Sequence, residues 1–243
     1  MEELAAAYQS AGEQIYVVRN GATTGRGALG YTAAVVEMKR QCEDLGISRM
    51  TIFAPGGNGG VAAGLIYGNQ LMGQPFRIVI VSVEDVRETL TAHIRSTISE
   101  AEEITGLPMD VPVEQAAEIT DAYRGGGWGE NTEESQQAVL SFARSEGIFI
   151  ENVYTSKVLV GMIDWIEQKK VSGPVCYLHT GGLGSLFAQK EGKTYGLRLF
   201  DSGCSDSDAG SGHCDAEGAA GHAGGHFYRT TDYLRMESVY RYQ

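Results

Sequence analysis

A glycine-rich loop after an apolar strand has the composition of an anion-binding site. Residues 49–72 read RMTIFAPGGNGGVAAGLIYGNQLM, and the apolar residues at 50–54 favour a buried strand that Pro55 ends. The residues that follow are Gly56, Gly57, Asn58, Gly59 and Gly60. Glycine permits positive φ and lets backbone N–H groups approach an anion, and a helix starting at about Val61 would add its positive dipole end. The loop is predicted to hold a phosphate or carboxylate, although a tight strand-to-helix connection would explain the same residues.

Two further segments carry side chains that could meet a ligand. Thr180 belongs to HTGG, directly after the apolar run 174–178, and a hydroxyl before two glycines favours ligand contact over simple turn chemistry. Trp128 lies in the flexible segment GGGWGE, where its ring could meet a substrate or plug the side of the domain. His179 is interpreted as a structural histidine.

The elements that must position these residues alternate between strand and helix. Strands are expected at 15–19, 50–54, 76–83 and 174–178, and helices at 1–13, 27–46, 84–105, 132–146 and 156–169 as well as after Val61. Residues 111–123 fit either a short helix at 114–118 followed by a strand, or an extended connection. Ser82 and Asn131 are expected to cap the helices that follow them. This order predicts an α/β fold with a mainly parallel, doubly wound sheet.

The loops at 20–25, 56–60 and 180–182 each follow an expected strand. In a parallel sheet the carboxyl ends of the strands meet at one edge, so the three loops should lie together there. A nicotinamide site would instead need an acidic residue about 20 residues past the glycine loop. Glu84 and Asp85 lie loosely at that distance, but no residues for hydride chemistry are identifiable.

Charge and composition narrow the partners. The net charge of -12 over 243 residues argues against a nucleic-acid partner, which would need clustered Lys and Arg. No apolar run is long enough to cross a bilayer, and the N-terminal residues are acidic rather than signal-like. We therefore expect a cytoplasmic protein that does not bind membranes.

The C-terminal residues differ in character from the rest of the chain. From Asp201 the sequence is rich in Gly, Ser, Asp and Ala with few aliphatic residues, so disorder is expected for a tail at 196–243 beyond a folded unit at 1–195. This tail contains potential zinc ligands, Cys204, His213, Cys214, His222 and His226. Because a second Cys-x-x-Cys half is missing, no metal site is predicted.

Five segments together resemble one enzyme family. In order and spacing, YVVRNGATTGRGALGY, APGGNGGVAAGL, GWGENTEES, NVYTSKVLVGMIDWI and HTGGLGSLFA resemble the pyridoxal-phosphate-dependent D-cysteine desulfhydrases and aminocyclopropane-carboxylate deaminases. The resemblance covers about residues 1–190. It implies a fold type II enzyme, related to the tryptophan synthase β chain, with pyridoxal 5'-phosphate as cofactor. In complete form such an enzyme is expected to be a homodimer with a small amino acid as substrate.

The resemblance also implies roles for individual residues. Gly56–Gly60 with Val61 stand where the family's Ser-Gly-Thr-Gly-Gly-Thr loop grips the cofactor phosphate, and the missing hydroxyls would each forfeit about 1.5–3 kcal/mol. Thr180 stands where a family threonine meets the pyridine nitrogen and leaves the ring unprotonated. Trp128 replaces the family's active-site tyrosine and cannot exchange a proton as a phenol can.

The family's catalytic lysine has no counterpart in this chain. Its Gly-Asn-Lys segment, which carries the Schiff-base lysine, and its Ser-Asn-His loop are both missing, and Lys157 matches a different family lysine. The sequence is thus interpreted as the C-terminal part of an incomplete fold type II enzyme, with no catalytic residue assigned. It would be a lyase or deaminase that gives keto acid, ammonia and sulfide but is inactive alone. The alternative is a non-catalytic module that binds pyridoxal phosphate, or a subunit needing another chain.

Overall fold

The computed structural model describes residues 2–187 of the 243-residue chain. Within them, the strands β1 (Met50–Gly56), β2 (Phe76–Ser82), β3 (Glu118–Thr120) and β4 (Val175–Tyr177) form a sheet in the order β3-β2-β1-β4. Each neighbouring pair is parallel. The helices are α1 (Glu2–Ser10), η1 (Asn20–Ala22), α2 (Gly25–Asp44), α3 (Gly60–Leu71), α4 (Arg87–Thr105), α5 (Val113–Ala116), α6 (Glu133–Glu146), α7 (Thr155–Glu167) and α8 (Leu183–Phe187). The predicted tail, with its potential zinc ligands, lies outside the described residues.

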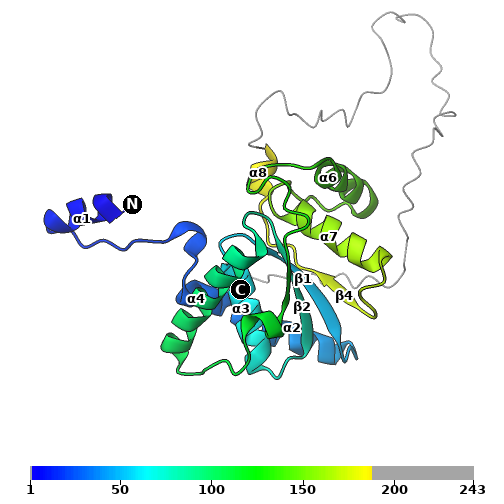
Figure 1. Ribbon diagram of the computed structural model, residues 1–243, viewed down its shortest axis with the longest axis horizontal. Helices are drawn as coiled ribbons and strands as arrows, with labels where there is room; N and C mark the ends of the chain where they lie inside the picture. Colours follow the sequence, from blue (N-terminus) through cyan, green and yellow to red (C-terminus); the bar gives the residue numbers. More distant parts are fainter. Residues whose placement is uncertain (1, 188–243) are drawn as a thin grey trace, which may run out of the picture.

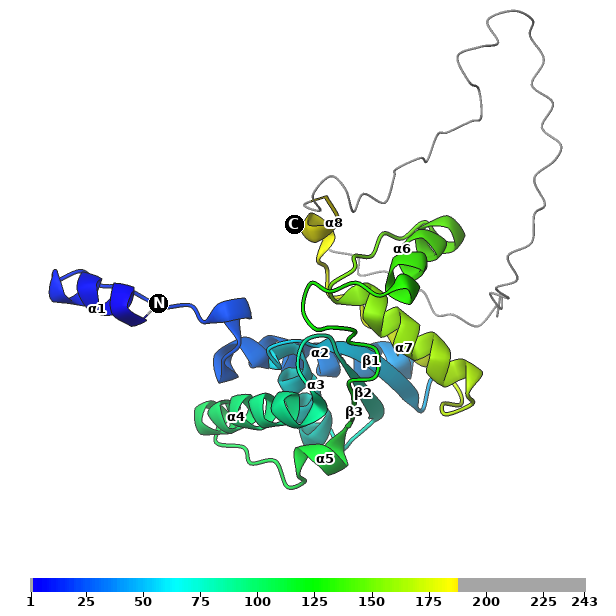
Figure 2. The ribbon, with the colours of Figure 1, turned by 45° about the horizontal axis from the view of Figure 1, so that its top comes forward.

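Helices cover both faces of the sheet. Alternate residues of β1 point to opposite sides: Ile52 joins the core formed with α2, α3 and α4, whereas Phe53 joins the core formed with α6 and α7. Figures 1 and 2 show α2, α3, α4 and α5 on one side of the strands, and α6 and α7 on the other. The predicted parallel, doubly wound α/β fold is confirmed.

The two central strands are apolar on both faces because helices cover each side. Every residue of β1 is buried. The prediction that Pro55 ends this strand is wrong, because β1 continues through Pro55, which pairs with Val81 of β2. The nitrogen of Pro55 faces the β4 side, and β4 has already ended at Tyr177, opposite Phe53. The missing N–H of the proline therefore lies on the side where the pairing with β4 stops.

The strand predicted at 15–19 is absent. These residues run without regular structure, and Tyr16 is 80% exposed. Their β-branched composition favours a strand, but no described strand lies alongside to pair with them. Figure 1 shows α1 standing away from the sheet at the far end of this segment.

Two helices begin at other residues than the sequence predicts, and local hydrogen bonds explain the difference. The Ser82 hydroxyl donates to the carbonyl of Asp85, and α4 begins only at Arg87. Thr132, rather than Asn131, caps α6 in a reciprocal capping box with Ser135. At 111–123 the helix-then-strand alternative is confirmed by α5 and β3.

No helix in the described part of the chain has the length and apolar character to cross a membrane.

Candidate functional site

The glycine loop connects β1 to α3 and leaves the start of that helix uncapped. Gly59 adopts a left-handed backbone conformation (φ 90°), and no side chain among the described residues caps the first turn of α3. The first amides of α3 therefore have no side-chain partner from the cap residue, which leaves them for an anion. Gly56 has a different role from the rest of the loop. It ends β1, and a Cβ there would lie 2.5 Å from Leu90 Cδ2, so this glycine permits packing against α4.

The loop at 20–25 lies against the glycine loop. A Cβ on Gly21 would lie 3.3 Å from Asn58 Nδ2, and one on Gly60 would lie 3.3 Å from Thr23 Oγ1. Glu100 of α4 holds this loop by accepting hydrogen bonds from the Arg19 guanidinium and from the Gly25 amide (2.9 Å). The Arg19 hydrogen bond, followed by that of Gly25, lowers the pKa of Glu100 below its ordinary value of 4.5. The 20–25 loop therefore contacts the glycine loop although no strand precedes it.

Thr180 follows β4 at the same edge of the sheet. The amide of Leu178 donates to Phe53 O of β1 (2.9 Å), which keeps the chain beside β1 as it enters the 180–182 turn. The side chain of His179 orients this turn: the Gly181 amide donates to Nδ1 (3.1 Å), so Nε2 carries the proton and donates to Phe149 O (2.8 Å). The interpretation of His179 as a structural residue is therefore consistent with its contacts.

Sequence reasoning missed Glu151, which joins the 180–182 turn to α7. Its carboxylate is fully buried and accepts hydrogen bonds from the amides of Val153 (2.6 Å), Tyr154 (2.9 Å) and Thr155 (2.7 Å) at the start of α7. A Cβ on Gly182 would lie 2.7 Å from Glu151 Cγ, so the turn packs on this side chain. An acidic residue just before a helix is the sequence signal that could have identified it.

Trp128 is linked to the glycine loop through Tyr154 and does not enter the core. Its side chain is 58% exposed, which excludes the alternative that it plugs the domain. The indole Nε1 donates to the Tyr154 hydroxyl (2.7 Å), and Tyr154 Cε1 would be 3.1 Å from a Cβ on Gly57. Trp128, Tyr154 and Gly57 therefore form a continuous surface at the carboxyl end of β1.

The described lysines offer no free buried amine to this surface. Lys157 is fully buried, and burial lowers the pKa of its amine, but the ammonium donates to the carbonyls of Val83, Arg124 and Gly127. Lys39, Lys169 and Lys170 are at least partly exposed. Lys190 and Lys193 lie outside the described residues.

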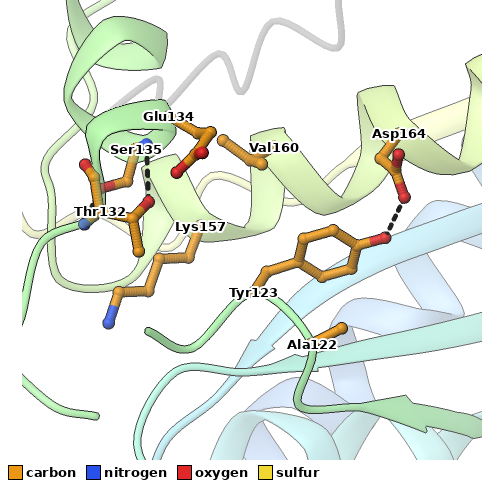
Figure 3. Close-up of a pocket in the computed structure, with 8 residues that line it drawn as sticks. All are labelled: Ala122, Tyr123, Thr132, Glu134, Ser135, Lys157, Val160 and Asp164. Atoms are coloured by element: carbon orange, nitrogen blue, oxygen red, sulfur yellow. Dashed lines mark hydrogen bonds between the residues drawn. The ribbon is translucent and has the colours of Figure 1, made fainter. Parts of the chain in front are cut away.

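A pocket of about 320 Å³ lies on the α6–α7 side, separate from the predicted site residues. Figure 3 shows Tyr123, Glu134 and Asp164 around it, with Lys157 extending along one side. Neither the glycine loop, Thr180 nor Trp128 lines it. In this pocket the Tyr123 hydroxyl already donates a hydrogen bond to the Asp164 carboxylate.

The glycine loop could hold a phosphate through its amides, and one nearby charge opposes this. Uncapped amides and the small surfaces of Gly57 and Gly60 leave backbone groups open to a phosphate. Glu84 Oε2 would be 3.8 Å from a Cβ on Gly57, so a carboxylate lies close to the same loop. The amides of the glycine loop fit a phosphate, whereas the negative charge of Glu84 must weaken phosphate binding.

Comparisons with known proteins identify the family of this chain. The family described as "Pyridoxal-phosphate dependent enzyme" matches residues 1–181. A solved structure titled "Crystal Structure Analysis of the ACC deaminase homologue" is similar, with 31% sequence identity and a TM-score of 0.68. The match covers 75% of this chain and 54% of that one, so this chain spans about half the length of its relative. With the family matched over most of its length, the chain belongs to the pyridoxal-phosphate-dependent enzymes.

Proposed function

We propose that this chain forms the cofactor-binding part of a pyridoxal-phosphate-dependent lyase or deaminase that acts on small amino acids such as D-cysteine. The observation that carries the proposal is the contact between the 20–25 loop and the glycine loop at the uncapped start of α3, with the 180–182 turn following β4, the strand beside β1. The similarity to an ACC deaminase homologue and the D-cysteine desulfhydrase-like motifs support the substrate class.

Each loop would have a distinct part in binding. The amides of Gly57–Gly60 would hold the phosphate, with Asn58 held against Gly21 at the edge of the loop. The Thr180 hydroxyl would meet the pyridine nitrogen, and because it is neutral it would leave that nitrogen without a proton. Trp128 and Tyr154 would shape the side on which the amino acid enters. When bound, pyridoxal phosphate supplies an electron sink for the α-carbon of the amino acid.

The amine that the reaction needs would come from outside the described residues. An amine that attacks an aldehyde must have a free lone pair, which burial and a lowered pKa can provide. Lys157 is buried, but its ammonium is fully engaged by three carbonyls, and this favours the second candidate function. In that alternative the chain binds the cofactor non-covalently and catalyses nothing alone.

Charge changes in the glycine loop test the proposed phosphate site. Pyridoxal phosphate would be titrated into the purified chain and followed by its absorbance. Asn58→Asp adds a carboxylate at the loop and Glu84→Gln removes one, so the first should weaken binding and the second should strengthen it. Each change should be about 3- to 10-fold, since a screened charge a few ångströms away contributes on the order of 1 kcal/mol. Gln115→Glu, an exposed change on α5, is the control of equal charge.

Borohydride reduction separates the two candidate functions. Reduction fixes the cofactor covalently only where a lysine has captured it, and mass spectrometry would locate the label. A binder without label, which releases no sulfide from D-cysteine, is the expected result for this chain alone. Identical affinities for Asn58→Asp, Glu84→Gln and the control would refute the phosphate site itself.

A further inference from the structure

A buried ammonium with only backbone ligands lies next to the proposed site. Lys157 Nζ donates to Arg124 O (2.7 Å), Gly127 O (2.8 Å) and Val83 O (3.2 Å). These contacts use all three N–H donors of the ammonium. No salt bridge to Lys157 occurs among the described residues. Backbone oxygens alone therefore replace its hydration shell.

Carbonyl oxygens around a desolvated cation are the ligands that proteins use for monovalent metal ions. Here the cation is covalently attached through the lysine side chain. Figure 3 shows this side chain extending from α7, with its nitrogen directed away from Val160 and Asp164. The burial of a charge is costly unless polar groups surround it. The ammonium therefore needs the three carbonyls as hydrogen-bond acceptors, and the carbonyls need the ammonium as their donor.

The three carbonyls come from segments that border the proposed cofactor site. Val83 directly follows β2, and Arg124 and Gly127 form the turn that precedes Trp128. Arg124 Nη1 also reaches Glu84 O (3.4 Å), but this contact is longer than all three made by Lys157. The ammonium is therefore the main polar tie between this turn, β2 and α7.

We propose that Lys157 is a positioning residue whose ammonium acts as a tethered monovalent cation. By holding the 124–127 turn it keeps Trp128 in hydrogen-bonding contact with Tyr154, and so keeps Tyr154 against Gly57. The effect on ligand binding rests on the proposed function, whereas the effect on Trp128 does not. The two can therefore fail separately.

Replacement by methionine creates a vacancy for a free cation. In Lys157→Met the new side chain ends about where Cε of lysine lies, so the carbonyls stay in place and the position of the ammonium is empty. Lys39→Met, which removes a partly exposed lysine paired with Glu43, is the matched control. The full chain would be studied in ammonium chloride and in choline chloride at equal ionic strength. The choline ion is too large to enter the site.

The main readout is the indole N–H resonance of Trp128, identified by its loss in Trp128→Phe. In Lys157→Met this resonance should move towards that of an unbonded indole in choline, and return to the wild-type position in ammonium. Binding of pyridoxal phosphate should fall by about tenfold or more in choline and recover in ammonium, as when one charge-assisted hydrogen bond is lost. Wild type and Lys39→Met should give the same result in both salts.

Several outcomes would overturn the inference. One is a Trp128 resonance in Lys157→Met that matches wild type in choline, and another is a displaced resonance that ammonium fails to restore. Lys157→Ala, with a larger vacancy, must show the same preference for ammonium. If both variants stayed unfolded in both salts, the site would offer no place for a cation and the proposal would be refuted. If wild type bound no pyridoxal phosphate while ammonium restored Trp128, only the proposed function would fail.

Discussion

Replacing Glu151 by glutamine should destabilise the chain more than any neutralisation of a surface glutamate. The buried carboxylate accepts from three amides at the start of α7, and Oε2 also accepts from the Ser185 hydroxyl (3.2 Å). Glutamine keeps the shape, but one of its two terminal atoms becomes an NH₂ donor. Whichever way the amide lies, at least one backbone N–H then faces another donor.

The cost follows from those contacts. If the NH₂ group takes the place of Oε2, the amide of Val153 loses its acceptor; if it takes the place of Oε1, the amides of Tyr154 and Thr155 lose theirs. A buried donor without a partner costs about 1–3 kcal/mol. The lost charge at a helix N-terminus adds about 0.3–1 kcal/mol. The sum of about 1.3–4 kcal/mol is a large part of a typical unfolding free energy of about 5–15 kcal/mol.

Urea unfolding of Glu151→Gln and of Glu133→Gln gives a direct comparison. Glu133 is exposed in the first turn of α6, so its neutralisation should cost only about 0.3–1 kcal/mol. The transition midpoint should fall clearly more for Glu151→Gln, with the same slope for both variants. Equal midpoints would refute the reasoning that the Glu151 carboxylate supports the start of α7.

Further predictions concern packing and pH. Gly64→Ala should destabilise the chain by about 1–3 kcal/mol, because its Cβ would lie 2.2 Å from Ala28 O between α2 and α3. Gly30→Ala, an exposed position in α2 with nothing within 4 Å, should instead stabilise it by about 0.5–1 kcal/mol, and thermal unfolding would compare the two. Glu100 has a lowered pKa in the folded chain, so the stability it adds is present above the unfolded value of 4.5 and is lost as pH falls through the folded pKa. Wild type and Glu100→Gln should differ in unfolding free energy by less than about 1 kcal/mol, because solvent screens this exposed pair. In acid unfolding titrations that difference should vanish.

The parts of the fold predicted from sequence are those fixed by local composition. β1 and β2 are runs of apolar residues long enough to indicate burial on both faces, and the glycines after β1 indicate a strand-to-helix turn. Residues 15–19 have equal strand propensity but lack a neighbour, and propensity alone cannot supply one. The cap of α6 was placed one residue early because serine, not the usual glutamate or glutamine, completes the capping box at Ser135.

The candidate site was harder to predict because its supports are tertiary. The sequence identified the glycine loop, Thr180 and Trp128, but the contacts between them pass through Glu151, Tyr154 and Lys157 of α7 and the segment before it. Lys157 in particular was recognised only as a lysine without the Schiff-base role. Nothing in its neighbouring residues shows that its ammonium meets carbonyls from Val83 and from the 124–127 turn.

Two buried charges at one end of α7 explain how these loops are held without a direct ion pair. The Glu151 carboxylate is satisfied by backbone N–H groups, and the Lys157 ammonium by backbone C=O groups. Each charge thus holds main-chain groups in place. Burial lowers the pKa of Lys157, and the attraction of the Glu151 carboxylate opposes part of that lowering. A substitution can remove the Glu151 or Lys157 side chain but not the backbone groups that they contact. The surface formed by Gly57, Tyr154 and Trp128 therefore depends on these two side chains more than on the glycine motif.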